Sequence, residues 1–368
     1  MARLEEICDI LDSRRIPITA SDRKPGPYPY YGANGIQDYV SDYIFDDELV
    51  LLAEDGGNFG SKEKPIAYRV SGKCWVNNHA HVLKPKDMLD VDYLCYSLMF
   101  YDVSGLVNGA TRQKLTQADM RKMEIPLRPM SEQKRITAVI NKVSDLISLR
   151  KQQLAKLDEL VKSRFVELFG TIHDNKFGYE IKTLQDVCEQ IKDGTHQTPT
   201  YTDDSVNGYK FLSSKDVTTG KIDWTHLKYI PEELHNELYA RIAPRKGDIL
   251  LAKNGTTGIA AIVDREEIFD IYVSLALLRP IEINSVYLWA AINSVETKQQ
   301  FDASLKGIGV PNLHLGEIKK ARIIVPPVEE QNQFAEFVKK TDKSKLAIQQ
   351  SLDKLETLKK SLMQKYFG

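Results

Sequence analysis

An internal repeat ends at the last residue of the sequence. Residues 109–170 align with residues 307–368 at a constant offset of 198 and without a gap, and seventeen of the 62 aligned positions are identical. Upstream the repeat is less exact: residues 51–53 match residues 250–252, and the offset drifts between 180 and 199. Insertions have therefore accumulated in the front of each copy, whereas the back of each copy has kept its length.

The back of each copy is predicted to be one long helix. Apolar side chains recur at steps of four and three residues from Ile136 to Leu168, and again from Phe334 to Tyr366. A period of about 3.5 residues over several turns is typical of a coiled-coil seam. Two equivalent helices in one chain most simply pack on each other, antiparallel about a pseudo-two-fold axis. The alternative is two independent amphipathic helices, each lying on its own domain.

The front of each copy is predicted to be a domain of short strands. Six segments are short, rich in β-branched residues and bounded by Gly, Pro, Asn or Asp: 49–53, 66–70, 79–83, 249–252, 259–263 and 273–278. The predicted fold class is α+β, with two mixed α/β domains in a pseudo-two-fold tandem repeat, separated by two long antiparallel coiled-coil helices. The predicted segments are domain 1 at 1–128, spacer helix 1 at 129–170, domain 2 at 171–326 and spacer helix 2 at 327–368.

Length and composition agree with this organisation. A chain of 368 residues suits two domains rather than one core. The sequence contains no apolar run long enough to span a membrane and opens without a signal-peptide pattern, so a cytoplasmic protein is expected. The four cysteines, Cys8, Cys74, Cys95 and Cys188, have no CxxC spacing. Reduced, packed thiols are therefore expected rather than metal ligands or disulfides.

The charge is nearly balanced, with a net value of -1. Residues 1–128 carry 16 basic and 19 acidic side chains, and residues 171–326 carry 18 and 21, whereas the two helical segments are at +3 and +2. Because counterion release scales with the cations a protein supplies, a DNA-binding role would require a partner to neutralise most phosphates. An ordinary soluble protein with a mixed-charge surface is equally consistent with the charge alone.

Sequence signatures of catalysis are absent. The spacing of Gly56, Gly60 and Lys62 does not fit a phosphate-binding loop, and no Asn or Asp precedes Pro-Pro-Tyr or Pro-Pro-Phe. The histidines form no HExxH motif, and His79 and His81 are interpreted as an ordinary turn or surface pair. Carboxylates are plentiful but unclustered in the sequence. The chain is therefore predicted to bind and position, with the chemistry carried by other proteins.

The sequence resembles a known family. Two variable domains, each followed by a helix that opens with Pro-x-x-Glu-Gln (129–133 and 327–331) and closes on Phe-Gly, resemble the specificity subunit of type I restriction-modification systems. The resemblance covers essentially the whole chain. Further similar stretches are 29–35, 54–56, 76–83, 111–115 and 125–127 in the first copy, and 193–199, 211–213 and 246–250 in the second. The second copy departs from the first at 308–312, so a contact made by Arg112 is not carried over to it.

The resemblance implies two target recognition domains, each reading one DNA half-site, with helices that fix the gap of unspecified base pairs. It further implies two modification subunits that carry S-adenosylmethionine and methylate adenine N6, and restriction subunits that use ATP and Mg. No cofactor is expected in this chain. Three alternatives stay open: the recognition component of a related fused methyltransferase-nuclease system, a coiled-coil scaffold that binds only proteins, and a nuclease with an unrecognised carboxylate site.

The candidate DNA-contacting residues are cationic, aromatic or rich in hydrogen-bonding groups, and most of them lie in polar, glycine-rich loops. Any turn-rich surface has a similar composition. In the first copy they are Arg14, Arg15, Tyr30, Tyr31, Asn34, Asn58, Asn77, Asn78, Arg112 and Lys114, and in the second copy they are Thr195, His196, Gln197, Ser214, Lys215, Lys253, Asn254, Thr256 and Lys306.

Overall fold

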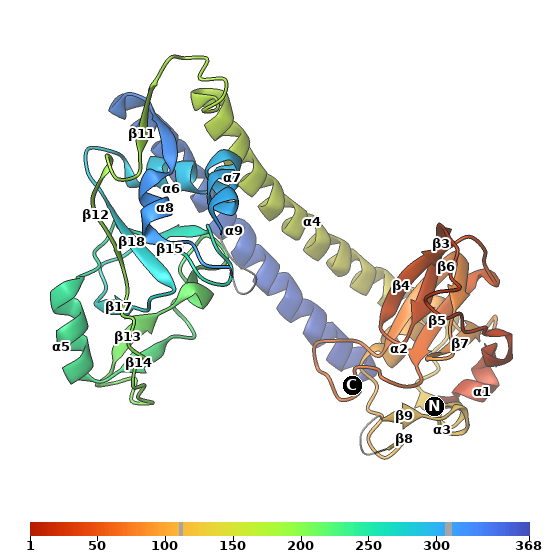
Figure 1. Ribbon diagram of the computed structural model, residues 1–368. Coiled ribbons are helices and arrows are strands. Elements are labelled where there is room, and N and C mark those ends of the chain that lie inside the picture. Colours follow the sequence, from red (N-terminus) through yellow and green to blue (C-terminus); the bar gives the residue numbers. More distant parts are fainter. Residues whose placement is uncertain (110–112, 306–310) are drawn as a thin grey trace. The chain divides into compact units, whose positions relative to one another are not determined.

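The structure is a computed structural model that describes residues 1–109, 113–305 and 311–368 (Figure 1). The chain divides into two compact units: unit 1 comprises residues 1–151 and 350–368, and unit 2 comprises residues 152–349. Each unit contains one β-rich domain, called domain 1 or domain 2, together with parts of two long helices. These helices, α4 (Met130–Phe169) and α9 (Val328–Phe367), have 40 residues each.

A six-stranded sheet forms the centre of domain 1. Its strands, in spatial order, are β2 (Cys8–Ile10), β7 (Ala80–Pro85), β5 (Phe45–Ala53), β6 (Ala67–Val76), β3 (Pro25–Gly32) and β4 (Gly35–Val40). All neighbours are antiparallel except β3 and β6. Side chains alternate between the faces of a strand, so Val50 and Leu52 pack in one hydrophobic cluster while Leu49 and Leu51 pack in another. Helix α2 (Val91–Met99) contributes Tyr93 and other residues to the first cluster.

Domain 2 repeats this strand order with one interruption. A four-stranded sheet has the order β12 (Cys188–Asp193), β18 (Leu275–Pro280), β15 (Ile249–Ala252), β16 (Ala260–Ile262), and a three-stranded sheet has the order β17 (Phe269–Ile271), β13 (Tyr209–Leu212), β14 (Lys228–Ile230). The pairing of β13 with β17 is parallel, as is that of β3 with β6. The continuous strand β6 therefore corresponds to β16 and β17 with an insertion between them, which accounts for part of the drift in the sequence offset.

Shorter elements complete each unit. Unit 1 contains β1 (Ala2–Arg3), α1 (Leu4–Ile7), the 3-10 turn η1 (Asp12–Arg14), β8 (Val107–Asn108), β9 (Lys114–Leu115), α3 (Gln117–Arg121) and β10 (Glu124–Ile125). Unit 2 contains β11 (Glu180–Thr183), the 3-10 turn η2 (Ser214–Val217), α5 (Glu232–Arg241), α6 (Ser285–Ile292), α7 (Val295–Ser304), α8 (Leu315–Lys320) and β19 (Arg322–Val325). All four cysteines are buried free thiols. None of the described helices has the length and apolar composition needed to cross a membrane.

The two long helices pack against each other in antiparallel orientation. In unit 1 the start of α4 shares a core with the end of α9, through Ile136 on the first and Phe367 on the second. In unit 2 the end of α4 shares a core with the start of α9, through Phe165 and Phe334. Ion pairs join the helices, such as Lys151 with Glu356 in unit 1 at 2.9 Å and Asp158 with Lys345 in unit 2 at 2.5 Å. The predicted fold is thus confirmed, and the six predicted strand segments all overlap strands.

Candidate nucleic-acid interface

An open depression in domain 1 brings together three of the predicted residues. Its lining includes Tyr31, Asn34 and Asn58, with Lys64 and Tyr68 beside them. Asn34 lies in the tight turn between β3 and β4, and its amide donates to the carbonyl of Gly56 at 2.9 Å. This bond fastens the turn to the loop that follows β5. The depression thus combines amide groups, aromatic rings and a lysine, a set that can contact both base edges and phosphate.

One of the two aromatic rings of this depression, that of Tyr68, is held by a hydrogen bond to the backbone. Tyr31 and Tyr68 lie 5.7 Å apart between ring centroids, with the planes tilted by 34°. The hydroxyl of Tyr68 donates to the carbonyl of Gly32, and burial raises the pKa of Tyr68. The hydroxyl therefore stays protonated at neutral pH. Ile36, which is 49% exposed, adds an apolar side chain at the rim, of the kind that can contact a thymine methyl group.

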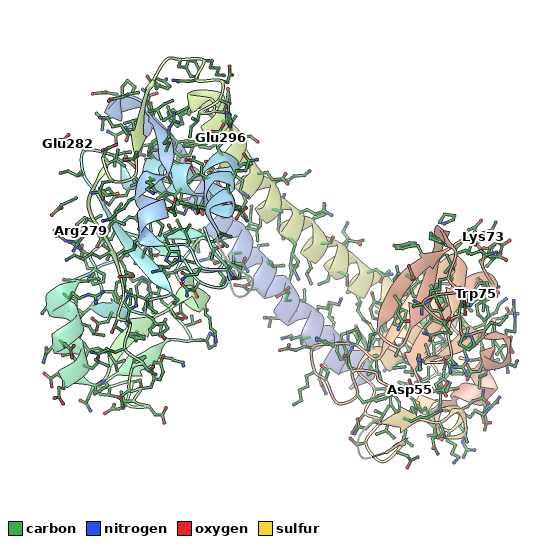
Figure 2. All side chains as sticks on the ribbon, viewed as in Figure 1. Asp55, Lys73, Trp75, Arg279, Glu282 and Glu296 are labelled. Carbon is green, nitrogen blue, oxygen red and sulfur yellow. The ribbon has the colours of Figure 1, made fainter. Side chains whose placement is uncertain are left out.

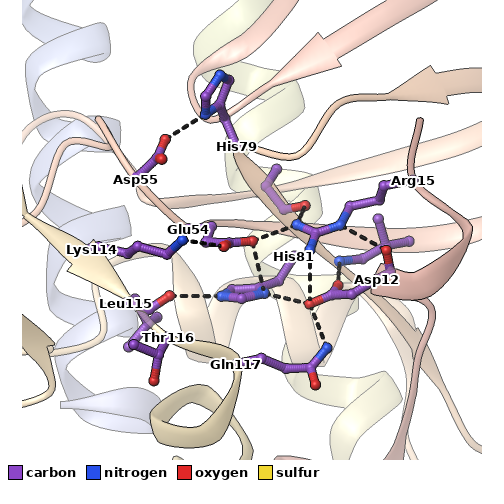
Figure 3. Close-up of polar contacts among 12 residues, drawn as sticks. Asp12, Arg15, Glu54, Asp55, His79, His81, Lys114, Leu115, Thr116 and Gln117 are labelled. Atoms are coloured by element: carbon purple, nitrogen blue, oxygen red, sulfur yellow. Dashed lines mark hydrogen bonds and ion pairs between the residues drawn. The ribbon is translucent and has the colours of Figure 1, made fainter. Parts of the chain in front are cut away.

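A buried ionic network lies behind the loops of domain 1 (Figure 3). Arg15 pairs with Glu54 at 2.5 Å and donates to the carbonyl of Ala80 at 2.8 Å. The Nδ1 of His81 lies 2.7 Å from Asp12, and its Nε2 lies 2.9 Å from the carbonyl of Leu115. Both ring nitrogens of His81 thus face acceptors. The network ties η1, the end of β5, β7 and β9 into one rigid base for the loops.

One expectation about these residues is wrong. His81 is fully buried and does not belong to a surface pair, because Asp12, distant in sequence, supplies its partner. Carboxylates that are unclustered in the sequence come together in space, since Asp12, Glu54 and His81 offer ligand atoms within 4.8 Å of one another. Arg15 and Lys114 already supply positive charge to this group, as a metal ion would. Burial raises the pKa of Asp12, but hydrogen bonds and the charge of His81 outweigh it and bring the pKa below its usual value.

The other predicted residues of domain 1 differ in accessibility. Lys114 is half-exposed and pairs with Glu54 at 3.0 Å. Asn78 is exposed, whereas Asn77 is buried, with its amide donating to Gln37 at 3.1 Å and its oxygen accepting from the backbone of His79 at 2.8 Å. His79 itself contacts Asp55, in the segment that follows β5 (Figure 3), and Figure 2 labels Asp55 on the ribbon of the whole chain. Asn77 therefore shapes the turn that presents Asn78.

The last two predicted residues of the first copy that the structure describes are Arg14 and Tyr30, and they differ in exposure. Arg14 is exposed, with its guanidinium over the ring of Phe45 at 4.8 Å. Tyr30 is buried, and its hydroxyl bonds to the backbone of Ile18. Arg112 lies outside the described residues.

In domain 2 two of the predicted residues, Lys253 and His196, contact Asp193. Its carboxylate lies 3.0 Å from both Lys253 and His196 and 3.7 Å from Arg241. Lys253 is buried, whereas the side chain of His196 is 68% exposed. Burial raises the pKa of Asp193, but the hydrogen bond and charge of Lys253, followed by those of His196, bring it below its usual value. Asp193 thus holds His196 at the surface while neutralising Lys253.

The remaining predicted residues of domain 2 lie in the surrounding loops. Thr195 is buried and accepts from the backbone N–H of Gln197 at 3.2 Å, which turns the exposed Gln197 outward. The backbone of Ser214 donates to Ser274 at 3.0 Å. Lys215 and Thr256 are exposed and Asn254 is half-buried. Lys306 lies outside the described residues.

The two domains carry opposite charges at one equivalent position. Val50 pairs with Leu83 in domain 1 as Ile249 pairs with Leu278 in domain 2. Four residues beyond Val50 and Ile249 stand Glu54 and Lys253, respectively. Each is neutralised within its own domain: Glu54 by Arg15 and Lys114, and Lys253 by Asp193. The charge difference between residues 54 and 253 is visible in the aligned sequences and could have indicated that Glu54 and Lys253 each have a partner of opposite charge inside their own domain.

Comparisons with known proteins agree on one family. The sequence matches the family described as type I restriction modification DNA specificity domain over residues 1–159 and 177–359. It is 29% identical to a Haemophilus influenzae protein assigned as a type I restriction enzyme specificity subunit, over 98% of this chain and 94% of that protein. It is 24% identical to the MjaVIII specificity subunit of Methanocaldococcus jannaschii, over 99% of this chain and 90% of that protein.

The fold is also similar to solved structures. The crystal structure of the S subunit of a type I restriction-modification system from M. genitalium has a TM-score of 0.61 and 15% identity, covering 100% of this chain and 95% of that one. A chain from a structural study of complex assembly and conformational transition in the type I system has a TM-score of 0.57 and 18% identity, covering 100% and 96%. The paired long helices and two β-rich domains are thus the architecture of this fold.

Proposed function

Because the chain belongs to the family of type I restriction-modification DNA specificity subunits, which are not themselves catalytic, we propose that it recognises a bipartite double-stranded DNA site. Domain 1 reads one half-site and domain 2 reads the other. The observation that carries this proposal is the repeated strand order of the two domains, with different loop residues on the same scaffold. A duplicated scaffold with distinct loops suits two short, distinct targets.

Within each domain the exposed loop residues are the proposed contacts. In domain 1 these are the depression around Asn34 and Asn58 together with Asn78, and in domain 2 they are His196, Gln197 and Lys215. The buried or paired residues Arg15, Asn77 and Lys253 support them from behind. Arg112 and Lys114 are proposed to contact phosphate, which positions the protein without reading sequence.

The long helices are proposed to set the gap between the half-sites. At 1.5 Å per residue, a helix of 40 residues is about 60 Å long. Their equal lengths and mutual packing support a spacer of fixed length. The number of unspecified base pairs would then be a property of this chain.

Two identical exposed stripes support binding of two identical partners. On α4 the stripe is Gln152, Lys156, Leu160 and Ser163, and on α9 it is Gln350, Lys354, Leu358 and Ser361. Steps of four, four and three residues place each set on one helix face. Leu160 and Leu358 are each 46% exposed. Core packing explains identity at buried positions but not at exposed ones, so these stripes favour a partner that binds each helix in the same way.

The partners are proposed to be two modification subunits, which carry S-adenosylmethionine and methylate adenine, with restriction subunits joining the assembly. The low positive charge of this chain supports such a division, because the partners then supply most of the phosphate contacts. Replacing Leu160 or Leu358 with Asp should each remove one modification subunit, and replacing both should abolish assembly. Val139, which is 43% exposed and lies off the stripe, provides the matched control V139D.

Mapping methylated adenines in a host that carries this chain and its modification partner tests the half-site proposal. Wild type should give a bipartite motif, and exchanging residues 1–128 for another such domain should change one half-site only. A change in both half-sites would contradict independent reading. Absence of any sequence-specific methylation, with the partner still bound, would favour a scaffold that binds only proteins.

A further inference from the structure

One hydrogen-bond pattern occurs in both domains at the junction with a long helix. The backbone N–H of Asp90, the N-cap of α2, donates to Oε1 of Gln133 at 2.8 Å. The backbone N–H of Asn284, the N-cap of α6, donates to Oε1 of Gln331, also at 2.8 Å. Gln133 and Gln331 are aligned residues of the repeat, and they are 0% and 1% exposed.

These glutamines supply the acceptor for the N-cap N–H that α2 and α6 lack within their own first turns. In a capping box, the N–H of the N-cap residue is accepted by a Glu or Gln at the third helical position. In α2 and α6 that position is occupied by Tyr93 and Tyr287 instead. Their hydroxyls donate to the backbone just before the long helices, to Pro126 at 2.8 Å and Ile324 at 2.6 Å. Each domain and the long helix that follows it are therefore joined by reciprocal bonds.

The amide nitrogen of each glutamine also donates to the backbone. Nε2 of Gln133 donates to the carbonyls of Arg128 at 2.7 Å and Met88 at 2.9 Å. Nε2 of Gln331 donates to the carbonyl of Pro326 at 2.7 Å. Both the donor and the acceptor atoms are thus engaged, so the glutamine fixes the first turn of the long helix in one orientation.

We propose that Gln133 and Gln331 are positioning residues that fix each recognition domain on the long helix that follows it, and thereby hold the gap between half-sites to one length. This inference rests on the proposed function. Helix α2 packs in the same core as strands β5 and β7, so a rotation of α2 against α4 would carry the loops of the sheet with it. The same relationship holds for α6, β15 and β18 in domain 2.

The test uses the full chain with its modification partner and maps methylated adenines. The variants Gln133→Met and Gln331→Met keep the length of the side chain and remove its donor and acceptor. Both half-site sequences should stay unchanged, while sites whose gap is one base pair longer or shorter become methylated about tenfold more often than with wild type. The double variant should broaden the distribution of gaps further than either single variant does. A purely structural role would lower stability without widening the range of gaps.

Gln133→Glu separates the two functions of the amide, because it keeps the acceptor for Asp90 and loses the donor. It should widen the gap distribution at least as much as Gln133→Met, because a buried carboxylate then faces the carbonyls of Arg128 and Met88. Gln331→Met, which loses one donated bond fewer, carries the test if Gln133→Met assembles poorly. Gln333→Met, on the exposed surface of α9 and outside both stripes, is the matched control and should leave the distribution unchanged. An unchanged gap in both Gln133 variants overturns the inference, whereas a wild-type map without a bipartite motif overturns the proposed function instead.

Discussion

Tyr93 lies edge-on against Phe367, the second-last residue of the chain, with the ring centroids 5.1 Å apart and the planes at 62°. In domain 2, Tyr287 lies against Phe169 in the same way, at 4.9 Å and 88°. Since Phe169 and Phe367 are aligned in the repeat, each domain is held by the start of one long helix and by the end of the other. The Phe of each repeated Phe-Gly pair is therefore a docking residue, and Gly170, with φ of +71°, follows the last residue of α4.

Removing these phenylalanines should destabilise the two units unequally. Phe169 is 1% exposed and also contacts Phe165 and Phe334, so Phe169→Ala should lower the free energy of unfolding by about 3–5 kcal/mol. Phe367 is partly exposed, so Phe367→Ala should cost less. Urea unfolding of the full chain measures both, with Val166→Ala, at a position 48% exposed, as control. Equal losses would show that burial at the two junctions does not differ in solution.

Charge reversal at the equivalent positions 54 and 253 should destabilise both domains. Glu54→Lys places an ammonium beside Arg15, and Lys253→Glu places a second carboxylate beside Asp193. Each leaves buried charge unpaired, so the free energy of unfolding should fall by about 3–5 kcal/mol. The neutral variants Glu54→Gln and Lys253→Met should lose less than the charge reversals.

Restoring the pair distinguishes a charge effect from a change of shape. Adding Asp193→Lys to Lys253→Glu should recover part of the stability, because the two charges are again opposite. No recovery in urea unfolding would mean that packing, rather than charge, determines the residue at position 253.

The buried pair of Asp270 and His235 should make the stability of domain 2 depend on pH. Asp270 is 2% exposed and lies 2.7 Å from Nδ1 of His235, whose ring stacks on Tyr209. Burial raises the pKa of Asp270 to about 6, although the hydrogen bond and charge of His235 oppose the shift. The folded state therefore binds this proton more tightly than the unfolded state does. The resulting stabilisation is complete below about pH 4 and is lost as pH rises through about 6.

Asp270→Asn isolates this effect because it removes the titrating group and keeps a hydrogen-bond acceptor for His235. The free energy of unfolding of wild type relative to the variant should fall, on the order of 2 kcal/mol, between pH 4 and pH 6.5. Parallel urea series on both proteins give this difference, in which the other carboxylates cancel. A constant difference across the range would contradict a raised pKa at Asp270.

The sequence predicted the parts of this protein that depend on local pattern. The periodic apolar residues from Ile136 onward indicated the long helices, and the aligned copies indicated two similar domains. The surroundings of Arg15 and Lys253 were not predictable, because their partners Glu54 and Asp193 are 39 and 60 residues away in the chain. Only the folded arrangement of strands and loops brings these charges together. Which exposed loop residues contact DNA stays a prediction.

The role of Gln133 illustrates the same limit. The Pro-x-x-Glu-Gln motif was visible as a repeated pattern, and its position in the first turn of a helix followed from the sequence. Its acceptor function at Asp90, 43 residues away, required the fold of the domain. A pattern repeated within one chain therefore indicated where an important contact lies but not what the contact is.

The length of the long helices should determine the gap between half-sites. Because α4 and α9 pack antiparallel, an insertion in one helix alone would have to bulge out. Four residues are therefore inserted after Lys151 and four after Gln349, which are aligned positions of the repeat. Four residues are close to one helical turn, so the seam stays nearly in phase while each helix grows by about 6 Å. The half-site sequences should stay the same and the gap should grow by about two base pairs.

Two controls define this experiment. Inserting two residues at both positions rotates the following face by about 200°, so Leu154 and Leu352 leave the seam and the chain and its assembly should be destabilised. Inserting four residues only after Lys151 should break facing contacts such as that between Arg150 and Ser351. Methylation maps and unfolding curves of the three proteins give the result. If the doubly extended protein is stable and assembled but its gap is unchanged, the spacing is set by the modification subunits or by bending of the DNA, and the helices are not the ruler.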